Sequence, residues 1–149
     1  MTRKEIAMNY FEEGYNCAQS VALAFEDLLC VKREGLLALT SSFGGGMGRL
    51  REVCGAVTGM FVVAGLLYGY TSPDAKEEKA SHYERIQNLA AEFSAKRNSI
   101  ICRELLGIEK KQESFVPEER TSEYYKERPC KELVGTAAEI LDDYILRYK

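Results

Sequence analysis

The feature that most constrains the fold is an uncharged segment from residue 53 to residue 70, with the sequence VCGAVTGMFVVAGLLYGY. A run of about 18 apolar residues is long enough to span a bilayer as a helix. Here, however, four glycines, one threonine and two tyrosines dilute the hydrophobic character. A helix that is apolar on all sides also occurs in the core of a protein, enclosed by its neighbours. We therefore expect a buried central helix and no membrane insertion.

The segments before this stretch have the sequence signals of short helices. Thr2 and Glu5 form a capping-box pattern ahead of a first helix. Asn16 is a favourable N-cap for a second helix, in which apolar residues recur at helical spacing as far as Leu28. A third, shorter helix is expected at residues 34–42, just before a run of glycines.

The segments after the uncharged stretch are also helical in pattern. The sequence Ser-Pro-Asp at residues 72–74 predicts the start of a long amphipathic helix. A short helix is expected to end at Gly107, and the polar stretch 109–128 is expected to form a loop with about one helical turn. Pro129 then opens the last helix, because proline is tolerated in the first turn.

These patterns predict an all-α fold, since no segment alternates apolar and polar residues as a strand does. The length of 149 residues and the hydrophobic content of 46% suffice to bury a core without disulfide bonds. We expect a single helical domain over residues 1–149, a bundle of about six helices around the buried, glycine-containing central helix.

The charge balance excludes some classes of partner. Lys and Arg number 20 and Asp and Glu number 23, which gives a net charge of -3 and no overall basic field to attract nucleic acid. The amino-terminal sequence MTRKEIAMNYFEEG has no apolar run of the kind that directs secretion, so we expect a cytoplasmic location. In that reducing compartment an odd number of cysteines, five, favours metal binding, redox chemistry or simple burial over structural disulfides.

A glycine run, GGGMG at residues 44–48, precedes the uncharged segment. It does not match a phosphate-binding loop, because Gly48 is followed by Arg49 and Leu50 where Lys and Ser or Thr are needed. The dinucleotide pattern fails as well, since an arginine occupies the position of its third glycine. We expect this run to shape the backbone that approaches Cys54.

Four of the five cysteines lie near the predicted beginnings of helices: Cys17, Cys54, Cys102 and Cys130. Unpaired amides and the helix dipole stabilise a thiolate at such a position. The dipole supplies about 0.3–1 kcal/mol, which is less than the roughly 1.4 kcal/mol of one pKa unit, so a reactive thiolate also needs a cation or a metal. Arg49, Arg51 and Arg103 are close in sequence to two of these cysteines.

Each of the four also belongs to the apolar stripe of its own helix, so that all four are expected to point inward. A shared site and ordinary core packing both agree with this pattern, because free cysteine is one of the most buried residue types. No C-x-x-C pair supports a local zinc site. Cys30 lies near a helix end and is expected to be an ordinary buried or half-buried cysteine.

Five short sequences together resemble the C_GCAxxG_C_C family of redox-active proteins. They are GYNCAQSV, FGGGMG, CGAVTG, CREL and the late cysteine that opens the last helix. The resemblance covers nearly the whole chain and assigns the family's four cysteines to Cys17, Cys54, Cys102 and Cys130, with Gly55, Ala56 and Gly59 in the central motif. It implies a helical domain, redox work by its cysteines and an iron-sulfur cluster. No C-x-x-C-H is present for covalent haem.

Three hypotheses follow for the function. In the first, the protein passes electrons to an unknown redox partner through an iron-sulfur cluster, with metal ligands Cys17, Cys54, Cys102 and Cys130 and with Gly55 and Gly59 beside the cofactor. In the second, metal-free thiols cycle between dithiol and disulfide, with Cys54 and Cys102 as the catalytic pair. In the third, the chain is a helical interaction module, or a homodimer built on the glycine-spaced face, and its cysteines are structural. The first two hypotheses make the protein an electron carrier or an oxidoreductase.

Overall fold

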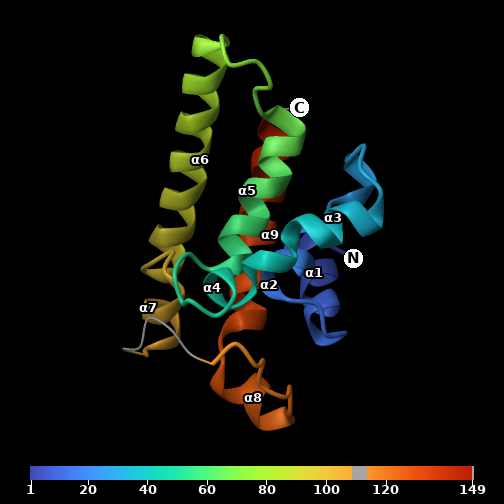
Figure 1. Ribbon diagram of the computed structural model, residues 1–149, viewed down its shortest axis with the longest axis vertical. Helices are drawn as coiled ribbons and strands as arrows, with labels where there is room; N and C mark the ends of the chain where they lie inside the picture. Colours follow the sequence, from blue (N-terminus) through green and yellow to red (C-terminus); the bar gives the residue numbers. More distant parts are fainter. Residues whose placement is uncertain (109–113, 149) are drawn as a thin grey trace.

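The computed structural model describes residues 1–108 and 114–148, which form α-helices and short 3₁₀ turns and no strand (Figure 1). The elements in chain order are α1 (Arg3–Glu12), α2 (Cys17–Leu23), η1 (Glu26–Leu28), α3 (Arg33–Thr40), η2 (Ser41–Phe43), α4 (Gly44–Met47), α5 (Gly55–Tyr68), α6 (Lys76–Arg97), α7 (Cys102–Leu106), α8 (Ser122–Glu127) and α9 (Cys130–Arg147). The predicted all-α fold is confirmed.

Local capping fixes where several helices begin. The Thr2 side chain accepts from the Glu5 amide and the Glu5 side chain from the Thr2 amide, the complete capping box predicted for α1. The same reciprocal arrangement joins Asn16 and Gln19 at the start of α2. Because Asn16 holds the first turn in this way, Cys17 becomes the first residue of that helix.

Two predicted helix boundaries are wrong. The second helix ends at Leu23 and not at Leu28, because Phe25 has a non-helical ψ of 10° and the chain turns into η1, where Leu28 is 40% exposed. The long helix begins at Lys76 and not at residues 72–74. At residues 72–74 the Ser72 side chain accepts a hydrogen bond from the Asp74 amide, which closes a turn. This turn lies before the helix and does not form its first turn.

The uncharged segment forms α5, which lies at the centre of the core. Val57, Met60, Val63 and Ala64 are fully buried, and α5 contacts α2, α6 and α9. A Cβ atom added at Gly59 would lie 2.7 Å from the carbonyl oxygen of Ala18, so only glycine lets the backbone of α2 approach α5 this closely. Nowhere in the two described ranges does a helix have both the length and the apolar character needed to cross a bilayer.

In Figure 1, α5, α6 and α9 run along the long axis of the molecule, with α1, α2 and α3 to one side. Helices α4, α7 and α8 gather at one end, where the loops before α5, α7 and α9 also meet (Figure 1). Because helices far apart in the sequence begin at this end, their first residues are brought close to one another.

Candidate functional site

Four of the five cysteines occupy the starts of four helices. Cys17, Cys102 and Cys130 are the first residues of α2, α7 and α9, and Cys54 is the N-cap of α5. All four line one cavity of about 70 Å³. Cys30 does not line it, and the predicted burial of this residue is wrong: it follows the short turn η1 and is exposed. The structure therefore brings together the four cysteines selected from the sequence.

A short backbone pairing holds Cys54 and Cys102 in place. Val53 and Ile101 form an isolated antiparallel bridge, each one residue before a cysteine. The Cys54 amide donates to the carbonyl oxygen of Ile100 at 2.8 Å, and the Cys102 amide donates to the carbonyl oxygen of Glu52 at 2.6 Å. These two bonds fix the segments that lead into α5 and α7, so both cysteines enter the cavity from a rigid backbone.

Glycines allow the backbone to pass close to the cysteines. Gly46 has a φ of 69°, and a Cβ atom there would lie 2.6 Å from the Cβ of Cys102. A Cβ at Gly55 would lie 3.0 Å from the Cβ of Cys17 and 2.8 Å from the carbonyl oxygen of Phe43. Gly55 lines the cavity, whereas Gly59 packs against α2 one turn further along. Gly45 and Gly46 of the glycine run thus form part of the wall around the sulfur atoms, and the close approach of Gly46 is to Cys102, whereas the sequence predicted one to Cys54.

Cys17 and Cys130 line the same cavity, and each thiol has the largest single effect on the pKa of the other. The neighbouring Cys17 thiol lowers the pKa of Cys130 to about 7 although burial opposes the shift. The positive charges of Arg128, Arg51 and Arg120 lower the same pKa further. The pKa of Cys17 is raised well above its usual range, first by Cys130 and then by burial. The arginines therefore favour the negative charge of this pair on Cys130.

The pKa values of Cys54 and Cys102 are raised, in contrast to the pKa of Cys130. Burial raises the pKa of Cys54 to about 12, although the amides of Ala56 and Val57 at the start of α5 stabilise its thiolate. Burial also raises the pKa of Cys102, against the effect of Arg51, whose guanidinium donates to the Cys102 sulfur at 3.7 Å. Both thiols consequently stay protonated when Cys130 ionises.

Three cationic side chains near the sulfur atoms were only partly expected from the sequence. Arg51 lines the cavity, as its position before Cys54 indicated. Arg103 does not line it, because its guanidinium pairs with the Glu52 carboxylate at 3.1 Å. Arg120 and Arg128 come from the polar stretch that was expected to be a loop, where no periodicity marks them as site residues. The sequence signal that could have identified these two arginines is their position shortly before Cys130.

Arg120 is fixed by three contacts. Its guanidinium donates to the carbonyl oxygens of Phe11 and Tyr15 and lies 4.0 Å from the centre of the Phe11 ring. The segment before α8 is thereby attached to the α1–α2 turn. Tyr124 lines the cavity beside Arg120 and packs edge-to-face on Tyr125.

A protein-family model described as "Putative redox-active protein (C_GCAxxG_C_C)" matches residues 15–144. The chain belongs to this family. The resemblance noted from the sequence is confirmed, and the match spans all four cavity cysteines, from Cys17 to Cys130. Neither a curated protein nor a solved structure gives a significant match to the chain.

The C_GCAxxG_C_C cysteines are not arranged as a metal site. In the part of the chain that the structure describes, there is no group of at least three His, Cys, Asp or Glu side chains that could hold a metal ion. All four cysteines nevertheless line one cavity, and the pKa values of Cys17 and Cys130 are each shifted mainly by the other thiol.

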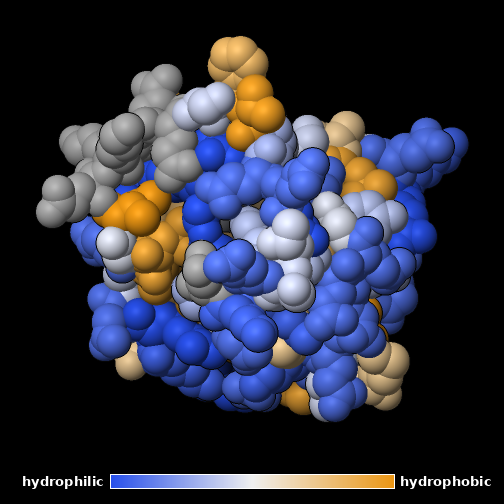
Figure 2. All heavy atoms as spheres, turned by 90° about the horizontal axis from the view of Figure 1, so that it is seen from below, coloured by the Kyte–Doolittle hydropathy of each residue, from blue (hydrophilic) through white to orange (hydrophobic). Residues whose placement is uncertain are grey.

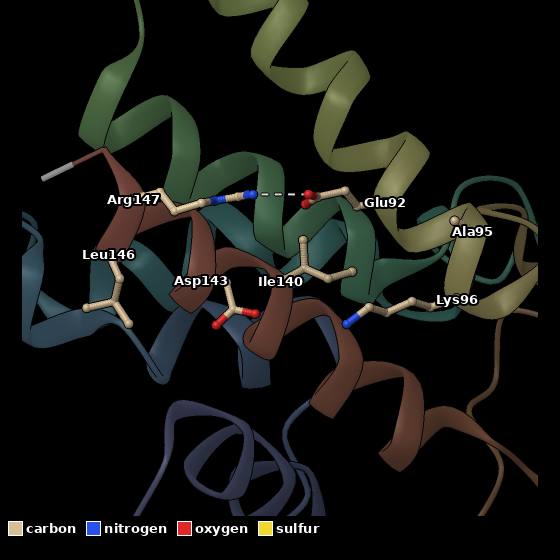
Figure 3. A pocket seen from close by; sticks show the side chains of 7 residues that line it. All are labelled: Glu92, Ala95, Lys96, Ile140, Asp143, Leu146 and Arg147. Carbon is tan, nitrogen blue, oxygen red and sulfur yellow. Dashed lines mark hydrogen bonds and ion pairs between the residues drawn. The ribbon is translucent and has the colours of Figure 1, made fainter.

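The larger groove of this C_GCAxxG_C_C protein lies elsewhere. It measures about 500 Å³ between α6 and α9, where Arg147 and Glu92 face one another at 3.3 Å (Figure 3). Lys96 and Asp143 also line it, and no cysteine does (Figure 3).

Proposed function

We propose that this protein performs thiol–disulfide redox chemistry and that Cys17 and Cys130 are the pair that cycles between dithiol and disulfide. The observation that supports this proposal is that Cys17 and Cys130, at the starts of the contacting helices α2 and α9, line one cavity of about 70 Å³. A disulfide between them requires the two sulfur atoms to reach the S–S distance of about 2.0 Å. Forming that bond removes two electrons and two protons from the pair.

Cys130 is the nucleophile in this proposal. The thiolate is the reactive form of cysteine, and a thiol whose pKa lies near the working pH is the most effective attacking group. The pKa of Cys130, about 7, meets that condition, because Cys17 and three arginines stabilise its negative charge. Cys17 then acts as the resolving thiol: it attacks the Cys130 sulfur once Cys130 carries a leaving group.

Cys54 and Cys102 support the pair in this proposal. Both are buried, and their pKa values are raised above the usual range. They keep the cavity free of further negative charge that would disfavour the Cys130 thiolate. The sequence-based assignment of Cys54 and Cys102 as the catalytic pair stays a prediction, and the experiment below tests it directly.

An iron-sulfur cluster is the second candidate, because four thiols line one cavity and thiolates are the usual ligands of such clusters. The lack of a metal-holding group among the described side chains counts against it. We therefore assign no step to a cluster. It would supply one-electron transfer if it were bound.

Disulfide mapping tests the proposal. Reduced protein, prepared without oxygen, is equilibrated with mixtures of reduced and oxidised dithiothreitol, quenched in acid, alkylated and analysed by mass spectrometry. We expect a Cys17–Cys130 disulfide that disappears in Cys17→Ser and Cys130→Ser and persists in the control Cys30→Ser, which alters an exposed cysteine outside the cavity. A bond between Cys54 and Cys102 would restore the sequence-based pair, and five free thiols at all potentials would exclude both versions.

The same preparation separates the cluster from the thiol pair. After incubation with ferrous iron and sulfide, the protein is desalted and assayed for visible absorption, iron and sulfide. We expect a colourless protein. Stoichiometric iron and sulfide that are lost in Cys54→Ser would instead favour the cluster, because the thiol-pair proposal gives Cys54 no direct part in the reaction.

A further inference from the structure

One part of the wall around the sulfur cavity is attached differently from the rest. Arg120 and Tyr124 line the cavity and belong to residues 118–128, which we call the strap. Every other lining residue lies in α1, α2, α4, α5, α7 or α9, or in the turns that lead into these helices. The strap contains α8, which packs extensively against no other element that the structure describes and lies at the end of the molecule (Figure 1).

The strap is closed on itself by its own side chains. The Arg128 guanidinium donates to the Glu118 carboxylate at 2.7 Å, and this contact joins the two ends of the strap. The same guanidinium lies 5.6 Å from the centre of the Tyr124 ring. Glu118 also reaches outside the strap, where its Oε1 atom lies 3.8 Å from an Arg49 nitrogen. Apart from that long ion pair, these contacts are internal, so the strap can move as one unit without losing them.

The strap is fastened to the core at Phe11 of α1. The Arg120 guanidinium lies 4.0 Å from the centre of the Phe11 ring and donates to the carbonyl oxygens of Phe11 and Tyr15. Tyr125 packs edge-to-face on the same ring, with the ring centres 6.0 Å apart. Because these attachments are made by side chains of the strap, they can be released without unfolding a core helix.

The cavity behind the strap is closed to reagents. At about 70 Å³ it has room for only a few waters. Cys54, Cys102 and Cys130 are 4%, 8% and 9% exposed, and Cys17 is half-buried. Access to the three buried thiols therefore requires part of the wall to move. The segment with the fewest packing contacts opens at the lowest cost in free energy, and in this wall that segment is the strap.

We propose that the strap is a lid over the sulfur cavity and that Cys130 becomes accessible when Arg120 and Tyr125 release Phe11. Tyr124 then leaves the cavity together with Arg120, while the core helices stay in place. Figure 2 looks onto the α8 end and shows hydrophilic residues over most of this face, so its outer side faces water. The lid goes beyond the proposed function, because it governs access to the thiols whatever reaction they undergo.

Alkylation of Cys130 measures the opening of the lid. Reduced protein is treated with iodoacetamide at a pH well above the Cys130 pKa of about 7, and each modified cysteine is quantified by peptide mass spectrometry. Tyr125→Ala removes the edge-to-face contact with Phe11, and Tyr125 itself does not line the cavity. We expect the Cys130 rate to rise about tenfold in this variant, because the loss of aromatic pairs has an effect of this size.

A second variant and a control accompany Tyr125→Ala. Arg120→Lys keeps a positive charge near Cys130 but loses the forked donor that holds two carbonyl oxygens, so the Cys130 rate should rise severalfold. Tyr148→Ala is the matched control, because it removes a tyrosine from a stacked pair at the carboxyl end of α9, whereas Cys130 begins that helix. The control should leave the Cys130 rate unchanged.

Hydrogen exchange of the same variants separates lid opening from general unfolding. Amides of the strap should exchange faster in Tyr125→Ala, and those of α5 should not. An unchanged Cys130 rate in both strap variants would overturn the lid, and so would an equal increase in exchange for the strap and α5. Alkylation needs no disulfide, so failure to find the Cys17–Cys130 bond would overturn the proposed function and leave the lid standing.

Discussion

Cys17 and Cys130, the first residues of α2 and α9, line one cavity, and each thiol has the largest single effect on the pKa of the other. This mutual effect favours the proton on Cys17 and the negative charge on Cys130. Neither partner would show this behaviour alone, because burial by itself raises the pKa of a thiol. The arginines around Cys130 strengthen the asymmetry. The site is therefore a polarised pair and not a set of four equivalent sulfurs.

The first prediction concerns the pH dependence of Cys130. Its alkylation by iodoacetamide should rise with pH through a midpoint of about 7, because the thiolate is the reacting form. This midpoint is lower than the usual cysteine pKa of about 8.5. Below the midpoint the rate should fall as the sulfur takes up a proton. Peptide mass spectrometry of the reduced protein gives the rate for each cysteine. A midpoint at or above the usual value would contradict the polarised pair.

The second prediction assigns part of that low pKa to Arg128. Replacing it by Gln removes a positive charge that stabilises the Cys130 thiolate, so the alkylation midpoint should move up by about one unit. Arg147→Gln serves as the matched control, because Arg147 pairs with Glu92 in the other groove. An unchanged midpoint in Arg128→Gln would show that Arg128 has no part in the low pKa of Cys130.

The third prediction concerns the glycine run. Gly46→Ala should destabilise the protein by about 1–3 kcal/mol, because the residue has a φ of 69° and the new methyl group would lie 2.6 Å from the Cβ of Cys102. Gly35→Ala is the control. Gly35 lies within α3 with open space around it, so alanine there should be neutral or stabilising by about 0.5–1 kcal/mol. Urea unfolding measures both, and equal effects would argue against a tight wall at Gly46.

The fourth prediction separates the two cysteine pairs. Cys54 should resist alkylation in the folded protein near neutral pH, because it is 4% exposed and its pKa is raised to about 12. Cys54→Ala should cost about 1 kcal/mol in the free energy of unfolding and leave the Cys17–Cys130 midpoint potential nearly unchanged. Denaturant titration and redox titration of the same sample provide the two values. A lost redox transition in this variant would return Cys54 to the catalytic pair.

The helices were predictable where their signals are local. The capping box of Asn16 and Gln19 involves residues within one turn, so it fixes Cys17 as the start of α2 in any all-helical arrangement. Pro129 is the N-cap of α9 and makes no side-chain capping bond, and its restricted backbone still marked the boundary at which the helix begins. The uncharged segment around Val57 and Met60 has no polar face and therefore had to be enclosed by other helices. Inward-facing cysteines followed from these assignments.

The partner of each cysteine depends on contacts between distant segments, which no local pattern encodes. The bridge of Val53 and Ile101 brings Cys54 beside Cys102, and the contact of α2 with α9 brings Cys17 to Cys130. Arg120 reaches the site only because α1 offers two carbonyl groups and the Phe11 ring. The sequence by itself determined the all-α character of the fold, the starts of α1 and α2, and the family. Tertiary packing decided which thiol keeps its proton, because a pKa depends on charges and donors within a few ångströms, whatever their separation along the chain.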